Sequence, residues 1–164
     1  MTTFWDTSAV LALVYVEPRT GDAVLARSQS SSQYAWRWMA VEAQAGLARR
    51  GARPAEWETL RAILDAFSYM DLTPKQTESA GTANREWRLR ASDAGHLYSF
   101  QQASLVFPDI QLICFDEEIV AAARGLKLSV WVPVAEGDSS GGTAVREARA
   151  GYGGRARQKR AARR

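Results

Sequence analysis

Short strand-like segments alternate with helix-like stretches along most of this chain, and this alternation constrains the fold more than any other feature of the sequence. The expected strands are residues 3–5, 33–38, 69–72, 111–115 and 128–132. The stretches between them have helical composition or an amphipathic period and run for about ten residues each. Because parallel strands need a crossover connection, which is usually a helix, the sequence predicts a three-layer α/β/α sandwich with a mostly parallel central sheet.

The charge distribution divides the chain into two parts. With 164 residues, of which 46% are hydrophobic, the chain can bury one core of ordinary domain size. The net charge of +3 is uneven, because residues 137–164 carry about +6 and the remainder about −3. We therefore predict one domain at residues 1–134, followed by a flexible Gly/Ser linker and basic tail at residues 135–164. The tail could add salt-dependent affinity for phosphates, or it could be a solvated end without a role.

Several classes of protein are not indicated by the sequence. The longest unbroken apolar run, residues 9–16, is far shorter than the roughly 20 residues that cross a bilayer. Asp6 precedes this run and no basic residue does, which does not fit a secretory signal. The single cysteine, Cys114, lies in an apolar segment, where a buried thiol is expected. The sequence thus predicts a cytoplasmic protein without a membrane span or redox chemistry.

Four carboxylates occur where expected strands end or helices begin: Asp6, Glu42, Asp93 and Asp116. The carboxyl ends of parallel strands meet at one edge of a sheet, so these side chains can converge although 36, 51 and 23 residues separate them. Mg²⁺ and Mn²⁺ bind oxygen ligands and need neither His nor Cys, of which the chain has one each. Such a cation can neutralise a phosphodiester and activate a water, so the pattern favours metal-dependent phosphodiester chemistry.

Each carboxylate also has a simpler interpretation. Asp6, Asp93 and Asp116 could each be a helix N-cap, and Glu42 could be a residue of a helix surface. The combination favours a site, because four such short windows would all contain an acid by chance roughly 1% of the time. The two roles are also compatible, since a capping carboxylate can bind a cation through its second oxygen.

The ordered set of motifs resembles the PIN-domain nucleases, specifically the VapC-like toxins of toxin–antitoxin modules. The resemblance covers about residues 3–133. Its most specific part is Asp93-x-x-His96-Leu97, followed by a strand that ends in Phe115-Asp116. The triplet Asp6-Thr7-Ser8 and the acidic residue Glu42 support it.

The resemblance implies a metal-dependent endoribonuclease that uses Mg²⁺ or Mn²⁺ and acts as the toxin of a type II toxin–antitoxin module. It places Asp6, Glu42, Asp93 and Asp116 at the family's four acidic positions, as catalytic residues and metal ligands. Ser8 matches a small hydroxyl residue that supports the first aspartate. His96 matches a frequent family residue, for which support of a carboxylate is expected rather than catalysis. The implied partners are an RNA substrate, a cognate antitoxin protein and a second copy of the chain in a homodimer.

Other features depart from the family core or leave alternatives open. Five basic residues are candidates for nucleic-acid contacts: Arg90, Arg155, Arg157, Lys159 and Arg160. For Arg90, a solvated helix end is an equally simple explanation. Gly95 stands where a bulkier apolar residue is usual, and it is expected to loosen the helix near the site. The alternative function is a non-catalytic module of the same fold that binds nucleic acid or a partner. A phosphotransfer domain ranks third, because Asp6-Thr7-Ser8 lacks the Asp-x-Asp of the dehalogenases.

Overall fold

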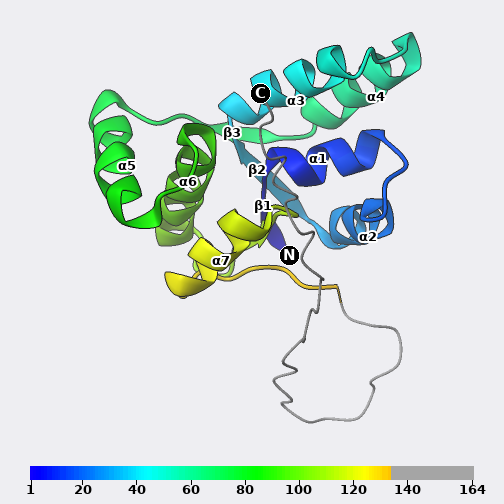
Figure 1. Cartoon of the computed structure of the whole chain (residues 1–164). Helices are drawn as coiled ribbons and strands as arrows, with labels where there is room; N and C mark the ends of the chain where they lie inside the picture. Colours follow the sequence, from blue (N-terminus) through cyan, green and yellow to red (C-terminus); the bar gives the residue numbers. More distant parts are fainter. Residues whose placement is uncertain (134–164) are drawn as a thin grey trace, which may run out of the picture. The chain divides into compact units, whose positions relative to one another are not determined.

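A four-stranded parallel sheet forms the centre of the domain. The computed structural model describes residues 1–133, and within them the strands are ordered β3-β2-β1-β4 (Figure 1). Their bounds are β1 Thr2–Trp5, β2 Ser32–Trp36, β3 Ser68–Met70 and β4 Gln111–Ile113. The central strand β1 pairs in parallel with β2 and with β4, and β2 pairs in parallel with β3. The predicted α/β fold with a mostly parallel sheet is confirmed.

Helices cover both faces of this sheet. α1 to α4 lie on one side and α5 to α7 on the other (Figure 1). Their bounds are α1 Thr7–Val14, α2 Thr20–Gln29, α3 Trp38–Arg49, α4 Pro54–Leu64, α5 Pro74–Trp87, α6 Ala91–Val106 and α7 Glu117–Gly125. Successive strand residues point to opposite faces, so Trp5 enters the core beneath α1 to α4 whereas Phe4 enters the core beneath α6 and α7. The expected three layers follow from this alternation.

The element boundaries differ from the sequence prediction at the points that matter for the site. α3 begins at Trp38 rather than near residue 41, so Glu42 lies in its second turn. α6 begins at Ala91, so Asp93 lies in its first turn and is not its cap. Residues 128–132, predicted to be a strand, form only an isolated parallel bridge between Leu112 and Val130. The next side chain, Trp131, packs into the core on the α1 side and donates its indole N–H to Gln29 Oε1 at 3.2 Å.

The predicted linker and basic tail lie outside the described residues, as do Arg155, Arg157, Lys159 and Arg160. The boundary between residues 134 and 135 therefore remains a prediction. Among residues 1–133, no helix combines the length and the hydrophobicity needed to cross a membrane.

Candidate functional site

Two of the predicted carboxylates follow adjacent strands of the sheet and cap the helices that come next. Asp6 follows β1, and its Oδ2 accepts a hydrogen bond of 2.9 Å from the Ser8 backbone N–H. Asp116 comes shortly after β4, and its Oδ1 accepts hydrogen bonds of 2.9 and 3.1 Å from the N–H groups of Glu118 and Ile119. The N-cap interpretation is thus correct for both residues. Within residues 1–133, the second oxygen of each carboxylate accepts no hydrogen bond, so both can also bind a ligand.

Ser8 joins the two loops that carry these aspartates. Its hydroxyl donates a hydrogen bond of 2.6 Å to Asp6 Oδ2 and accepts one of 2.9 Å from the Phe115 backbone N–H. Phe115 immediately precedes Asp116, so a single hydroxyl fixes the end of β1 relative to the loop after β4. The predicted supporting role of Ser8 has a direct structural counterpart in this bridge.

Glu42 is held by two side chains from other elements. Its Oε2 accepts a hydrogen bond of 2.6 Å from the Thr7 hydroxyl and lies 2.6 Å from His96 Nε2. The other ring nitrogen of His96, Nδ1, lies 3.6 Å from Asp6 Oδ1. His96 is only 1% exposed, so the imidazole lies behind the carboxylates and between two of them. This position supports the expectation that His96 orients acidic side chains.

The pKa values of this pair move in opposite directions. Burial disfavours the charged imidazolium, but the charges of Asp6, Glu42 and Asp93 and the hydrogen bond to Glu42 outweigh it, so the pKa of His96 is raised. Burial also opposes ionisation of Glu42, yet hydrogen bonds to His96 and Thr7 and the charge of His96 lower the pKa of its carboxyl group. The hydrogen bond and the neighbouring charges therefore favour the charged forms of both Glu42 and His96.

Asp93 has the opposite environment, because negative charge gathers around it. It lies in the first turn of α6 and accepts a hydrogen bond of 3.3 Å from the Ser92 hydroxyl. Its pKa is raised, first by partial burial and then by the charges of Asp116 and Asp6. The charge of His96 and the hydrogen bond from Ser92 offset part of this effect, and a bound cation would relieve the remaining repulsion.

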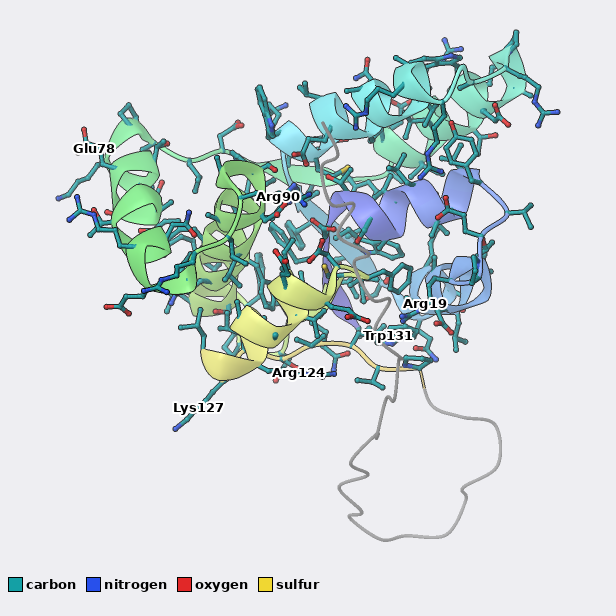
Figure 2. The ribbon with its side chains drawn as sticks, viewed as in Figure 1. Arg19, Glu78, Arg90, Arg124, Lys127 and Trp131 are labelled. Carbon is teal, nitrogen blue, oxygen red and sulfur yellow. The ribbon has the colours of Figure 1, made fainter. Side chains whose placement is uncertain are left out.

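All four predicted carboxylates line one pocket of about 320 Å³. Thr7 and Ser8 line it from α1, and Trp38 and Arg49 line it from α3. Arg90, labelled in Figure 2, is exposed just before α6 and is not among the residues that line this pocket. The structure thus brings together residues that lie up to 110 positions apart in the sequence, from Asp6 to Asp116.

The chemistry of this pocket fits a hard divalent cation. All four acidic donors are carboxylates, and Asp6, Asp93 and Asp116 each keep at least one oxygen without a hydrogen bond inside the described domain. Within residues 1–133, no group of three or more His, Cys, Asp or Glu side chains is close enough together to hold a metal ion. Mg²⁺ commonly binds through one or two carboxylates with waters and substrate phosphate as its other ligands, so a looser arrangement of donors suits it.

The structure explains Gly95, for which the sequence expectation was a loosened helix. A Cβ atom at this position would lie 2.3 Å from Cζ3 and 2.4 Å from Cη2 of Trp36. The Trp36 ring therefore occupies the space that a larger side chain would fill. Its edge also meets the ring of His96, with centroids 5.3 Å apart and planes at 86°. Gly95 thus leaves no gap, and Trp36 packs directly against the residue that holds Glu42.

Two residues that support the site, Thr7 and Trp36, were not predicted from the sequence. Thr7 was noted only as part of a triplet, although a hydroxyl next to Asp6 was a usable signal. Trp36 carries no sequence signal for its contact with His96, because the two residues meet only through the tertiary fold. Cys114 is buried as predicted, and burial raises the pKa of its thiol, which disfavours the thiolate form.

Comparison with known proteins identifies the fold. No family model and no curated protein matches the chain. Among solved structures, Mycobacterium tuberculosis VapC20, described as a sarcin-ricin loop cleaving toxin, matches with a TM-score of 0.55 and 24% identity over 74% of this chain and 95% of that one. PAE2754 from Pyrobaculum aerophilum matches with a TM-score of 0.52 and 19% identity over 74% and 84% of the two chains. The domain therefore has the VapC-like PIN-domain fold.

Proposed function

We propose that this protein is a metal-dependent endoribonuclease that hydrolyses RNA phosphodiester bonds. The observation that carries the proposal is the convergence of Asp6, Glu42, Asp93 and Asp116 on one pocket at the carboxyl edge of the sheet. A carboxylate cap alone explains Asp6 and Asp116, but it does not explain why Glu42 and Asp93 face the same space. Similarity of fold to VapC20 supports an RNA substrate, because that protein is described as a sarcin-ricin loop cleaving toxin.

In this proposal Asp6, Asp93 and Asp116 hold Mg²⁺ or Mn²⁺, and Glu42 binds it directly or through a water. The cation would supply neutralisation of the phosphate and activation of water. The chain itself positions the donors: Ser8 fixes Asp6 against the loop of Asp116. Thr7 and His96 similarly hold Glu42, so the pocket is preorganised by hydrogen bonds before any substrate arrives.

We further propose that the nuclease is the toxin of a toxin–antitoxin module, with a cognate antitoxin and a homodimeric state. The similarity to a VapC toxin in fold supports this biological role. A pocket lined by four carboxylates is also suited to a basic side chain of an inhibitor, which would compete with the cation.

The first experiment is cleavage of a mixed RNA pool by the purified protein with Mn²⁺, Mg²⁺ or EDTA. Asp93→Asn removes one donor at the site, and Asp109→Asn, an exposed aspartate between α6 and β4, is the matched control. We expect metal-dependent cleavage by the wild type and by Asp109→Asn, and none by Asp93→Asn.

Two results would contradict the proposal. Cleavage that survives EDTA or the loss of Asp93 would exclude this carboxylate site as its source. If the folded wild type cuts no RNA but binds it, with or without Asp93, the non-catalytic binding module becomes the better description.

A further inference from the structure

One face of α3 forms a long wall of the carboxylate pocket. The residues that line the pocket from this helix recur at the spacings of one helical face: Trp38, Val41, Glu42, Ala45 and Arg49. With a rise of 1.5 Å per residue, Trp38 and Arg49 are about 16 Å apart along the helix axis. Glu42 lies one turn from Trp38, so the pocket extends from an aromatic end through the acidic centre to a basic end.

Trp38 is a rigid aromatic surface at the rim of this pocket. It is 49% exposed, and its ring lies against Trp36, with centroids 6.3 Å apart and planes at 35°. Trp36 in turn is seated on Gly95 and packed against His96. The exposed indole is therefore supported from behind by a ring that is itself fixed, while its free surface borders the residues that we propose to be catalytic.

We propose that Trp38 is a stacking platform for an unpaired base adjacent to the scissile phosphate, an inference that rests on the proposed ribonuclease function. A nucleobase is the flat, largely apolar part of RNA, and stacking on an aromatic side chain needs no particular base sequence. In a duplex both faces of a base are covered by its neighbours, so the site selects RNA that is single-stranded at the cut. Arg49 lies at the other end of the pocket and forms no ion pair within residues 1–133. In this proposal it contacts a phosphate further along the same RNA strand.

The test separates a flat ring from mere apolar bulk. Trp38→Phe keeps an aromatic face, whereas Trp38→Leu keeps apolar volume without one. Leu105→Ala is the surface control, because Leu105 is 75% exposed and lies at the C-terminal end of α6, away from the pocket. On a single-stranded oligonucleotide that contains a mapped cut, Trp38→Leu should lower kcat/KM roughly tenfold or more, and Trp38→Phe should retain most of it. Leu105→Ala should match the wild type, and the same oligonucleotide annealed to its complement should be a poor substrate.

Abasic residues introduced on either side of the cut identify the stacked base. At one of these positions the abasic substrate should lose as much kcat/KM with the wild type as Trp38→Leu loses with the intact substrate. Combining the variant with that substrate should cause no further loss, because both changes remove the same contact. The proposal would be overturned if the losses from the variant and from the abasic substrate multiply at every position, or if wild type and Trp38→Leu have equal kcat/KM. Either result would favour a protein partner as the ligand of the exposed ring.

Failure of the ribonuclease function itself gives a different result. If the wild type cuts no RNA, the stacking platform is judged by binding alone, using the fluorescence anisotropy of labelled single-stranded oligonucleotides. A Kd that is roughly tenfold or more higher for Trp38→Leu than for the wild type, but unchanged for Trp38→Phe, would support the stacking platform in a protein that binds RNA without cutting it. Equal Kd values would overturn it.

Discussion

Replacing Gly95 with alanine should destabilise the protein by about 2 kcal/mol. The new Cβ would lie 2.3 Å from a Trp36 ring carbon, whereas carbon atoms in favourable contact are about 3.5–4.0 Å apart. Overpacking of this kind costs about 1–3 kcal/mol, and the upper end applies because the neighbour is a rigid ring between Trp38 and His96. Alanine returns about 1 kcal/mol in helix propensity, which leaves the stated net loss.

The assay is urea denaturation together with thermal unfolding. An unfolding entropy of about 2.1 cal/mol/K per residue over the described domain converts the loss into a decrease in Tm of about 7 °C. Gly81→Ala in α5 is the matched control, since an added Cβ there meets nothing within 4 Å. The same substitution should therefore stabilise at Gly81 by about 1 kcal/mol and destabilise at Gly95.

A second variant shows whether Trp36 is the cause. In a Trp36→Leu background the clash disappears, so Gly95→Ala should stabilise the protein there by about 1 kcal/mol, giving a coupling free energy of about 3 kcal/mol between the two sites. If Gly95→Ala raises the Tm as Gly81→Ala does, or if the effects of the changes at Gly95 and Trp36 are additive, the Trp36 ring does not oppose a larger side chain at position 95. Because Trp36 contacts His96, a destabilised Gly95→Ala protein should also show reduced nuclease activity.

Three further predictions concern the carboxylate pocket. Thr7→Val should reduce the cleavage rate about tenfold, because the carboxylate of Glu42 loses a hydrogen bond of 2.6 Å. Thr7→Ser keeps the hydroxyl and should keep the wild-type rate. Equal rates for the two variants in a cleavage assay would contradict this role of Thr7. In EDTA, Asp93→Asn should raise the Tm by about 1–4 °C at pH 7. The raised pKa of Asp93 means that its charged form is disfavoured in the folded state. The gain in Tm should therefore appear above the unfolded pKa of about 3.9 and vanish below it. A gain in Tm that persists at pH 3 would show another cause. Adding Mn²⁺ at 100 times its Kd should stabilise the wild type by about 2.7 kcal/mol in a thermal-shift titration, and an undiminished shift in Asp116→Asn would place the ion elsewhere.

The fold class and the four acidic positions could be predicted from the sequence alone. Short apolar segments followed by helices leave few alternatives to a parallel sheet, because each crossover must return the chain to the same edge. Because both residues follow strands that end at this edge, Asp6 and Asp116 could be predicted to lie close together although 110 positions separate them. The local chemistry of Asp6 and Asp116 as helix caps was equally visible, since capping depends on neighbours only two or three residues away.

The way these carboxylates are held depends on contacts between elements that meet only in the folded domain. The contact between His96 and Glu42 joins α6 to α3, and the space above Gly95 is filled by a ring from β2. Neither follows from periodicity or spacing, because a sequence pattern shows which face of an element is buried and not which side chain it meets there. For the same reason a glycine that suggested a loosened helix packs directly against Trp36, whose ring contacts both His96 beside the carboxylate pocket and Trp38 at its rim.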